Sequence, residues 1–229
     1  EIVSGHDGLV CRPTDEGKYL VIFCDEVNLP ANDNYGTQIV ITFMRQLIEN
    51  KGYWRPKDHK WIKVERLVFV GACNPPTDPG RVVMTPRFLR HCPVLFVDFP
   101  NYYSLLTIYG TFVKGILSKA NQLSKWEEAT TKTMCQLYSA SSYKFTADIQ
   151  PHYIYSPREL SRWVRAIKVV LDTGVYIDDN EFIRLLAHEG LRIFCDRLVE
   201  AEDQLWTQNK LDEILIENFN VDERVLSRP

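Results

Sequence analysis

The sequence predicts an α/β protein in which a part with a parallel β-sheet is followed by an all-helical part. Short apolar runs that end in turn residues occur within about the first 100 residues, and such runs are typical of strands buried in a parallel sheet. From residue 101 onwards, apolar residues recur at helical spacing in long stretches. The 229 residues suffice for one large domain or two small ones, and we expect two parts, 1–100 and 101–229.

The expected elements of the first part alternate between strands and helices. Residues 1–18 are polar and predict a loop or a weak hairpin. A helix is indicated by apolar residues that repeat on one face from Ile39 to Ile48, and Lys51-Gly52 ends it. The other expected elements are a strand at 20–24, a β-hairpin at 53–65, a strand at 67–73, a short helix or turn at 85–91 and a strand at 94–98.

The second part is expected to contain only helices. The third of them has a clear start, because Ser156 is a good N-cap, Pro157 suits the first helical position and Glu159 completes a capping box. The expected helices span about 102–118, 125–145, 157–171, 181–199 and 208–219. Three tryptophans fall at apolar helical positions and are expected in the core: Trp126, Trp163 and Trp206.

The composition is that of an ordinary globular protein, with 45% hydrophobic and 25% charged residues. The net charge of −3 gives no basic field for nucleic acid. No apolar run reaches membrane-spanning length and no signal-peptide pattern is present, so we expect no membrane partner and a soluble protein of a reducing compartment. The six cysteines form no C-x-x-C pair, which favours buried free thiols, among them Cys24 and Cys73.

Two adjacent carboxylates, Asp25 and Glu26, directly follow the first predicted strand. Parallel sheets carry their chemistry at the carboxyl ends of their strands. The pair fits a Walker B site, in which Asp25 holds Mg²⁺ through its water shell and Glu26 orients and polarises the attacking water. A solvated strand end or a helix N-cap is the alternative.

Asn74 ends the second predicted strand in the stretch Gly71-Ala72-Cys73-Asn74-Pro75-Pro76. Its side chain could hydrogen-bond a γ-phosphate or the attacking water, and the two prolines prevent the strand from continuing. An Asn-Pro turn alone would also explain it. Polar groups at the ends of two successive buried strands nevertheless favour a site.

Three arginines are further candidates. Arg87 and Arg90 lie on the predicted short helix, where an arginine can project from a domain face and stabilise charge at a neighbouring site. Ordinary surface or salt-bridge groups are the alternative.

Arg158 lies in the first turn of a helix, where the dipole disfavours a cation, so an anionic partner is expected. That partner is either a ligand or a nearby acid.

A zinc site is not expected. His188-Glu189 matches the start of H-E-x-x-H, but Arg192 stands where the second histidine would be. The five histidines show no other ligand spacing, and no Ser/His/Asp constellation stands out.

The chain resembles the dynein heavy chain family in five stretches taken in order: F-C-D-E-V-N-L-P, G-A-C-N-P-P-T-D-P-G-R, R-F-L-R-H, H-Y-I-Y-S-P-R-E-L-S-R-W-V-R and H-E-G-L-R-I-F-C-D-R-L-V. The resemblance covers about residues 18–219. Within the motor ring of that family, these residues are most similar to the third AAA+ module. The stretch S-P-R-E-L-S-R-W resembles the cytoplasmic rather than the axonemal branch. The implied fold is part of an AAA+ (P-loop NTPase) large subdomain with a parallel sheet, followed by a helical AAA+ lid subdomain.

The resemblance implies a role for each candidate residue. Asp25 matches the Walker B acid on the metal side and Glu26 the hydrolytic one. Asn74 matches sensor I. Arg90 matches the arginine finger for the site of the preceding module, with Arg87 as second choice. Arg158 matches sensor II, and the 53–65 hairpin matches an insert that faces the ring.

The family's P-loop is absent from the sequence, which contains no G-x-x-x-x-G-K-[ST]. The resemblance implies that it lies upstream of Glu1. We therefore expect this chain alone to bind Mg-ATP weakly or not at all. A sheet without its P-loop strand is also expected to expose an unpaired edge and an apolar face.

The implied function is that of a fragment of a minus-end-directed microtubule motor, namely a regulatory module that binds and hydrolyses ATP. The implied cofactors are ATP or ADP and Mg²⁺. The implied partners are neighbouring AAA+ modules of the same heavy chain, dynein light and intermediate chains, microtubules, and a WD-repeat regulator of the lissencephaly type. The alternatives are an interaction module without activity and a module of another tandem-ring ATPase, such as a midasin-like protein.

Overall fold

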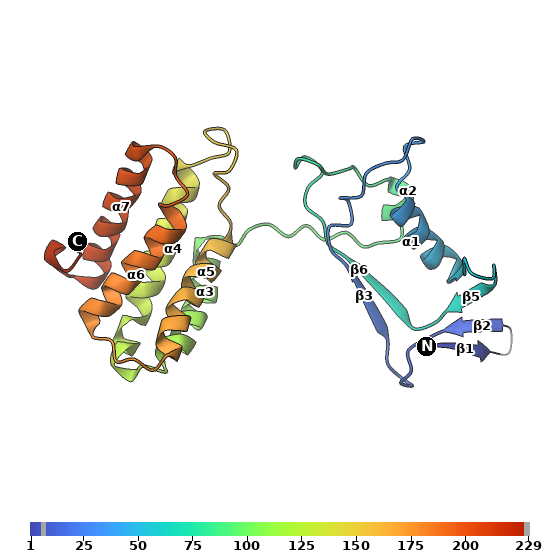
Figure 1. The fold of residues 1–229 in the computed structure, drawn as a ribbon, viewed down its shortest axis with the longest axis horizontal. Coiled ribbons are helices and arrows are strands. Elements are labelled where there is room, and N and C mark those ends of the chain that lie inside the picture. The colour runs from blue at the N-terminus through green and yellow to red at the C-terminus, as the bar shows by residue number, and fades with distance from the viewer. Residues whose placement is uncertain (6–7, 227–229) are drawn as a thin grey trace. The chain divides into compact units, whose positions relative to one another are not determined.

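The computed structural model describes residues 1–5 and 8–226 and divides into two compact units, Glu1–Phe96 and Val97–Pro229 (Figure 1). The first unit contains strands, of which two pairs are parallel, and short helices, whereas the second is helical. The fold class predicted from the sequence is therefore confirmed. None of the described helices is both long and apolar enough to cross a membrane.

The N-terminal residues and the predicted hairpin form one four-stranded sheet. Its strands lie in the order β1 (Ile2–Gly5), β2 (Gly8–Cys11), β5 (Trp61–Val64) and β4 (Gly52–Trp54). The β1–β2 and β4–β5 pairs are antiparallel, and β2 and β5 are parallel. The hairpin prediction at 53–65 is thus confirmed, and the weak N-terminal hairpin gains its stability by pairing with it.

The two buried-strand signals pair with each other. β3 (Leu20–Cys24) and β6 (Leu67–Gly71) form a parallel two-stranded sheet in which Leu20 lies opposite Leu67 and Cys24 opposite Gly71. Parallel strands need a long connection, and α1 (Ile39–Asn50) lies within it. Residue Lys51 ends α1 in a left-handed conformation, with φ of 51°.

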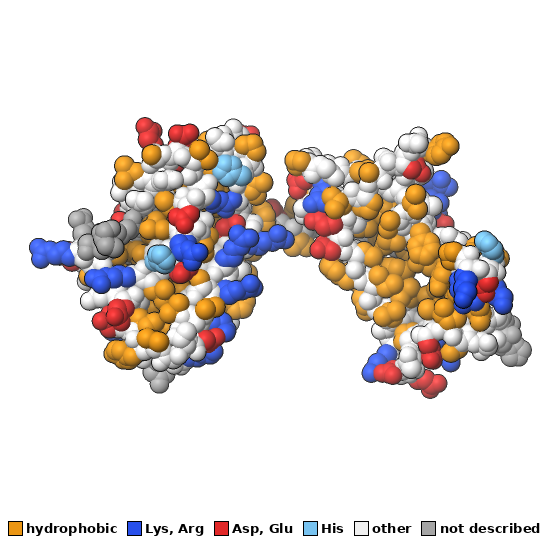
Figure 2. Space-filling view, viewed as in Figure 1, with side chains coloured by type: hydrophobic (Ala, Val, Ile, Leu, Met, Phe, Trp, Pro, Cys, Tyr) orange, Lys and Arg blue, Asp and Glu red, His pale blue; other side chains and the backbone are white. Residues whose placement is uncertain are grey.

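A small core holds α1 and α2 (Pro86–Leu89) to the strand ends. Ile41 and Met44 of α1 pack with Val27, which follows β3, and with Phe88 of α2. One face of β3 and β6 remains uncovered, as expected, and Figure 2 shows apolar side chains gathered there. Its exposed members, which alternate along the two paired strands, are Val21, Phe23, Val68 and Val70.

Two sequence expectations in this unit are wrong. Residues 94–98 form no strand, and the side chains of Val94, Leu95 and Phe96 are largely exposed. A strand needs a hydrogen-bonding neighbour, and no described strand pairs with this segment. Cys73 is exposed rather than buried, because it lies beyond the end of β6. None of the six cysteines forms a disulfide.

The second unit contains the five predicted helices: α3 (Tyr102–Leu117), α4 (Glu127–Lys144), α5 (Pro157–Asp172), α6 (Asp179–Phe194) and α7 (Ala201–Phe219). One 3₁₀ turn, Asn121–Trp126, lies between α3 and α4, and a second, Glu223–Leu226, follows α7. The predicted start of the last helix was seven residues late, because its first turns carry acids rather than a clear apolar face.

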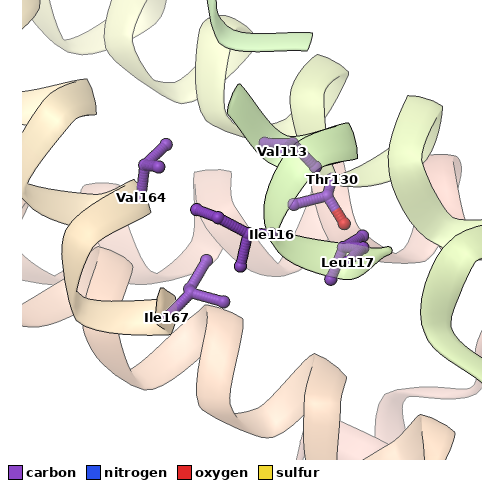
Figure 3. A pocket seen from close by; sticks show the side chains of 6 residues that line it. All are labelled: Val113, Ile116, Leu117, Thr130, Val164 and Ile167. Carbon is purple, nitrogen blue, oxygen red and sulfur yellow. The ribbon is translucent and has the colours of Figure 1, made fainter. Parts of the chain in front are cut away.

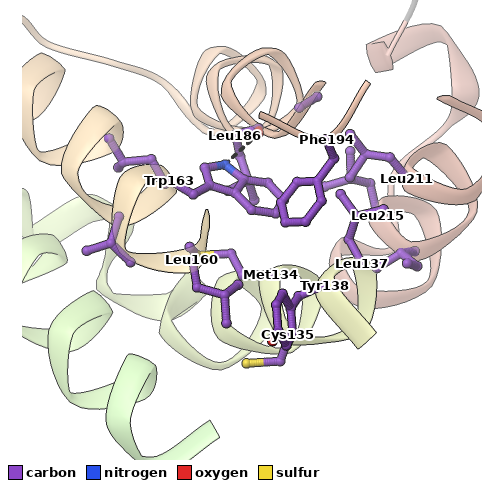
Figure 4. Packing of buried hydrophobic residues seen from close by; sticks show 14 of the residues in the cluster. Met134, Cys135, Leu137, Tyr138, Leu160, Trp163, Leu186, Phe194, Leu211 and Leu215 are labelled. Carbon is purple, nitrogen blue, oxygen red and sulfur yellow. Dashed lines mark hydrogen bonds between the residues drawn. The ribbon is translucent and has the colours of Figure 1, made fainter. Parts of the chain in front are cut away.

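Trp163 lies at the centre of the helical core (Figure 4). It is fully buried, and its indole Nε1 donates a hydrogen bond to the carbonyl oxygen of Leu186 at 3.1 Å. Gly190 lies so close that a Cβ atom there would be 2.4 Å from Trp163 Cζ2. Trp126 and Trp206 pack against the same core and are partly buried, so the core prediction for the tryptophans is confirmed.

The same unit contains a cavity of about 10 Å³ (Figure 3), close to the volume of one water probe. Apolar side chains of α3 and α5 line it together with Thr130 of α4. The hydroxyl of Thr130 is buried and has no hydrogen-bond partner among the described residues. This cavity is a packing defect, and the Thr130 hydroxyl is the one polar side-chain group among the residues that line it.

Candidate functional site

The carboxyl ends of β3 and β6 form the candidate site. The parallel pairing continues past both strands, because Ala72 N donates to Cys24 O at 2.9 Å and Val27 N donates to Ala72 O at 3.1 Å. The loops that carry Asp25 and Asn74 therefore begin side by side. Predicted polar residues from two distant stretches of sequence thus come together at one end of the sheet.

Asn28 joins these two loops. Its side chain is only 1% exposed, and its Nδ2 donates a hydrogen bond to the carbonyl oxygen of Asn74 at 2.8 Å. Its own backbone carbonyl oxygen accepts from Val82 N at 3.0 Å. Sequence reasoning missed Asn28, although a polar residue between Val27 and Leu29 was a usable signal.

Asp25 is exposed at the end of β3, and its Oδ1 accepts a hydrogen bond from Glu26 N at 3.0 Å. A single exposed carboxylate suits Mg²⁺, which keeps most of its water and takes one or two protein carboxylates plus phosphate oxygens. No group of three or more histidine, cysteine or acidic side chains capable of holding a metal exists in the described part of the chain.

Glu26 forms an ion pair with Arg81. The distance from Glu26 Oε2 to Arg81 Nη1 is 2.6 Å. Glu26 also has a left-handed backbone conformation, with φ of 53°, which is uncommon for a residue other than glycine. Sequence reasoning missed Arg81, since nothing in Asp78-Pro79-Gly80-Arg81 indicates a partner 55 positions away.

Asn74 presents an exposed side chain for which the described residues provide no hydrogen-bond partner. The backbone that follows turns tightly, because Asp78 N donates to Pro75 O at 3.1 Å and Arg81 N donates to Asp78 O at 3.2 Å. The Asn74 amide is thus available to a ligand, while its backbone is held by Asn28.

Arg90 follows α2 and is bound to the end of α1. Its Nη2 donates to Glu49 Oε1 at 2.7 Å, and His91 Nε2 lies 2.9 Å from the same oxygen. Hydrogen bonds from Arg90 and His91 lower the pKa of Glu49. Arg87 is exposed and has no ion-pair partner among the described residues. Among the described residues, no hydrogen bond or ion pair joins either arginine to Glu26 or Asn74.

Arg158 belongs to the second unit, in the first turn of α5. The predicted capping box is present: Ser156 N donates to Glu159 Oε2 at 2.8 Å, and Arg158 N donates to Ser156 Oγ at 3.3 Å. Within the described residues no carboxylate lies within ion-pair distance of the exposed Arg158, so the nearby-acid alternative has no support. Glu159 instead faces Arg197, at 3.4 Å.

A concave space of about 750 Å³ in the first unit does not contain the candidate residues. Its lining is mostly apolar and includes Leu20, Ile22, Phe43 and Tyr53. The candidate groups lie at the opposite ends of the strands from Leu20, so this space is not the site. The groups at the strand ends fit a hydrated Mg²⁺ and an attacking water, whereas the sequence supplies no glycine-rich loop for phosphates.

Two family models match the chain. Residues 10–100 match the family described as "P-loop containing dynein motor region", and residues 112–204 match "Dynein heavy chain, ATPase lid domain". Together they span both structural units.

Curated relatives agree with these matches. A cytoplasmic dynein heavy chain of Dictyostelium discoideum is 53% identical over 221 residues, which make up 96% of this chain and 5% of that protein. A cytoplasmic dynein heavy chain of Drosophila melanogaster is 48% identical over 97% of this chain and 5% of its own length. Dynein heavy chain-like protein 1 of Plasmodium falciparum is 46% identical over 100% of this chain and 5% of its length. The chain thus spans about 5% of the length of these relatives, and it belongs to the dynein heavy chain family.

Proposed function

We propose that this chain supplies the metal-side and water-side residues of an ATP-hydrolysing AAA+ site in a dynein heavy chain. The observation that carries the proposal is the meeting of Asp25, Glu26 and Asn74 at the carboxyl ends of two paired parallel strands. Ligands bind at this edge in open α/β sheets. Membership of the dynein family favours ATP over other phosphate substrates.

Each residue has a distinct task in the proposed reaction. Asp25 holds the water shell of Mg²⁺, and the bound ion neutralises charge that develops on the phosphate oxygens. Glu26 orients and polarises the water for in-line attack on the γ-phosphorus. Asn74 donates its side-chain amide to the γ-phosphate or to that water, which keeps the two reactants aligned.

The proposed arginines act at two different sites. Arg158 would reach the nucleotide of this module from the lid, and its lack of an acidic partner among the described residues supports this role. Arg90 would serve the site of the preceding module as an arginine finger. In this structure Arg90 forms the salt bridge that was its alternative role, with Glu49, so this pair would have to open before Arg90 reached a neighbouring site. Arg87 stays the second choice.

We further propose that the chain belongs to the third AAA+ module of a cytoplasmic motor ring. The proposal rests on the five sequence stretches that resemble this module. In that setting ATP turnover here would regulate a minus-end-directed microtubule motor. The neighbouring modules would be direct partners. Light and intermediate chains, microtubules and a WD-repeat regulator would be partners of the whole motor, which would act in the cytoplasm on the cytoskeleton.

The chain alone is expected to bind Mg-ATP weakly, because its sequence lacks the backbone nest and lysine that cradle the phosphates. Isothermal titration of the 229-residue chain should give no binding at micromolar ATP concentrations. Micromolar affinity with one site per chain would contradict the proposal that the phosphate-binding part of the site is missing from this chain.

The proposal is tested by Glu26→Gln in a dynein heavy chain motor that carries this segment. The variant should bind ATP but lower hydrolysis at this site by about 10²–10⁴-fold, because the water loses its base. Labelled nucleotide should remain as triphosphate, and microtubule gliding should slow. Glu16→Gln, an identical change at an exposed residue of the same unit, is the matched control.

The second candidate is an interaction module without chemistry of its own. The exposed apolar face of β3 and β6 favours this candidate, because exposed apolar patches mark surfaces that bind other proteins or segments. Under this candidate, Glu26→Gln and Glu16→Gln would behave alike in the nucleotide and gliding assays. Such a result would replace the enzymatic proposal.

A further inference from the structure

The turn between α6 and α7 binds the segment that leads into α5, and Arg197 makes the central contacts. Its Nη2 donates hydrogen bonds to the carbonyl oxygens of His152 at 2.8 Å and Ile154 at 3.1 Å. Its Nη1 donates to Glu159 Oε1, in the first turn of α5, at 3.4 Å. One guanidinium group therefore joins the approach to the helix and its first turn.

Further contacts fix the same turn to the same approach. The carbonyl oxygen of Arg197 lies 3.2 Å from His152 Nε2, and Val199 N donates to the hydroxyl oxygen of Tyr153 at 3.1 Å. The Arg197 guanidinium also lies over the ring of Tyr155, 4.7 Å from its centre. An arginine that stacks on a ring and donates several hydrogen bonds is well fixed in place.

Glu159 carries this constraint to the cap of α5. Its side chain is only 8% exposed, and its two oxygens have different partners. Oε1 faces Arg197, whereas Oε2 accepts a hydrogen bond from Ser156 N at 2.8 Å. Separation of a buried charge from its partner is costly, so the pair should stay formed in the folded unit. The first turn of α5 is thus held at its cap and at its third residue.

Arg158 has no comparable support of its own. Its side chain is exposed and makes no ion pair with the described residues. A long side chain of this kind gives up much rotamer freedom when it binds a ligand. The backbone from which Arg158 projects is fixed, however, because the neighbouring residues Ser156 and Glu159 are held. A fixed backbone limits the space that the guanidinium group has to search.

We propose that Arg197 is a positioning residue that holds the first turn of α5 so that Arg158 reaches the phosphates of the bound nucleotide. This inference rests on the proposed function, since it assumes that Arg158 contacts the nucleotide. Arg197 itself does not touch the nucleotide. It acts through Glu159 and through the carbonyl oxygens of the residues that precede the helix.

The expected effects follow from this division of roles. Arg158→Ala removes the contact with a charged group and should speed nucleotide dissociation about 10–100-fold. Arg197→Met removes all donors of the guanidinium group and should give part of that effect, about 3–10-fold. The double variant should match Arg158→Ala within about twofold, because a positioning residue has no effect without the residue that it positions.

The test uses a dynein heavy chain motor that carries this segment. The probe is a labelled ATP analogue with a non-hydrolysable bridge between the β- and γ-phosphorus atoms, and its dissociation is followed by stopped flow. The phase that changes in Arg158→Ala belongs to this site among all sites of the motor. The same phase is then measured in Arg197→Met and in the double variant.

Two conservative variants complete the set. Arg197→Lys keeps the charge and should speed dissociation less than Arg197→Met. Glu159→Gln keeps an oxygen that can cap the helix but loses the charge that faces Arg197, so it should speed dissociation by a smaller factor. Where Arg197→Met fails to fold, Glu159→Gln gives the deciding measurement.

Arg184→Met is the matched control. Arg184 Nε donates to the carbonyl oxygen of Val225 at 2.9 Å, so this change also removes a bond from an arginine to the backbone in the same unit. It should leave dissociation of the analogue unchanged. Thermal unfolding of every variant shows whether a lower stability of the helical unit accompanies an effect on dissociation. A merely structural role of Arg197 would lower this stability and add to the effect of Arg158→Ala.

The outcomes separate the inference from the function on which it rests. If Arg158→Ala speeds dissociation but the Arg197 and Glu159 variants do not, the positioning role is disproved and the nucleotide contact of Arg158 stands. The same holds if the effects of Arg158→Ala and Arg197→Met multiply in the double variant. If Arg158→Ala leaves dissociation unchanged, the nucleotide contact and the positioning role are both disproved.

Discussion

Asn28 donates its side-chain amide to the carbonyl oxygen of Asn74 over 2.8 Å and so ties together two loops whose residues lie 46 positions apart. The bond is buried and lies between the end of β3 and the end of β6. It sets the spacing between the proposed acid pair and the proposed sensor. The site geometry thus depends on a residue that takes no part in the chemistry.

Replacement of Asn28 by alanine should loosen this connection. The loss of a buried hydrogen bond should cost about 1–3 kcal/mol in the free energy of unfolding of the first unit. Amide hydrogen exchange at residues 72–82 should accelerate, since Asn74 O loses its side-chain donor, while the backbone bond from Val82 N to the carbonyl oxygen of residue 28 remains possible. Asn34→Ala, at an exposed site of the same connection, is the control. Unchanged exchange at 72–82 would show that the loops are held by other contacts.

Gly190 should tolerate no side chain. A Cβ atom there would meet Trp163 at 2.4 and 2.8 Å, and neither the ring nor the helix can shift freely in a packed core. Gly190→Ala should destabilise the helical unit by about 1–3 kcal/mol, measured by thermal or urea unfolding.

Gly115→Ala is the matched control for that change. Gly115 lies in α3, and a Cβ atom added there would have open space within 4 Å. Alanine at this position should therefore stabilise the helix by about 0.5–1 kcal/mol. Equal effects of the two substitutions would contradict the packing described around Trp163.

Thr130→Val should stabilise the helical unit. Its hydroxyl is buried without a partner among the described residues, so an apolar group of the same shape should remove a desolvation cost of about 1 kcal/mol. Thr131→Val is the control, because the Thr131 hydroxyl donates to Glu127 O at 2.8 Å. That change should be neutral or destabilising. A loss of stability for Thr130→Val would indicate a bound water in the cavity.

The hairpin turn should respond to acid through Asp58. A hydrogen-bonded ion pair with Arg55 lowers the pKa of Asp58 from 3.8 to about 2. Because the folded pKa lies below the unfolded one, the pair stabilises the turn above about pH 4 and the benefit is lost as the pH falls toward 2. An NMR titration of the Asp58 carboxyl carbon should show a midpoint near 2, and Arg55→Ala should raise it toward 3.8.

Local signals in the sequence were sufficient for most elements. The strands β3 and β6, the hairpin and the capping box before α5 all have patterns contained within a few residues. The segment at 94–98 has the same apolar pattern as β3, yet it forms no strand, because pairing depends on a neighbour that composition does not reveal. The start of α7 was missed since its first residues are mostly acidic and polar.

The candidate site was predictable only in part. Asp25, Glu26 and Asn74 follow strand ends, and strand ends can be read from the sequence. Asn28 and Arg81 act through contacts with segments 46 and 55 positions away, so their local sequence gives no indication of those partners. The bond between Arg90 and Glu49 could likewise not be predicted from the sequence, because it joins the end of α1 to the residue after α2.

The most direct test is a cryo-electron microscopy map of the heavy chain motor with Glu26→Gln, frozen in the presence of Mg-ATP. Density for an intact triphosphate should lie beyond the carboxyl ends of β3 and β6. The metal should lie on the side of Asp25, and the Asn74 amide should lie within hydrogen-bond distance of the γ-phosphate. An empty edge at these strands, or a nucleotide bound away from Asp25 and Asn74, would contradict the assignment of this edge as the ATP site.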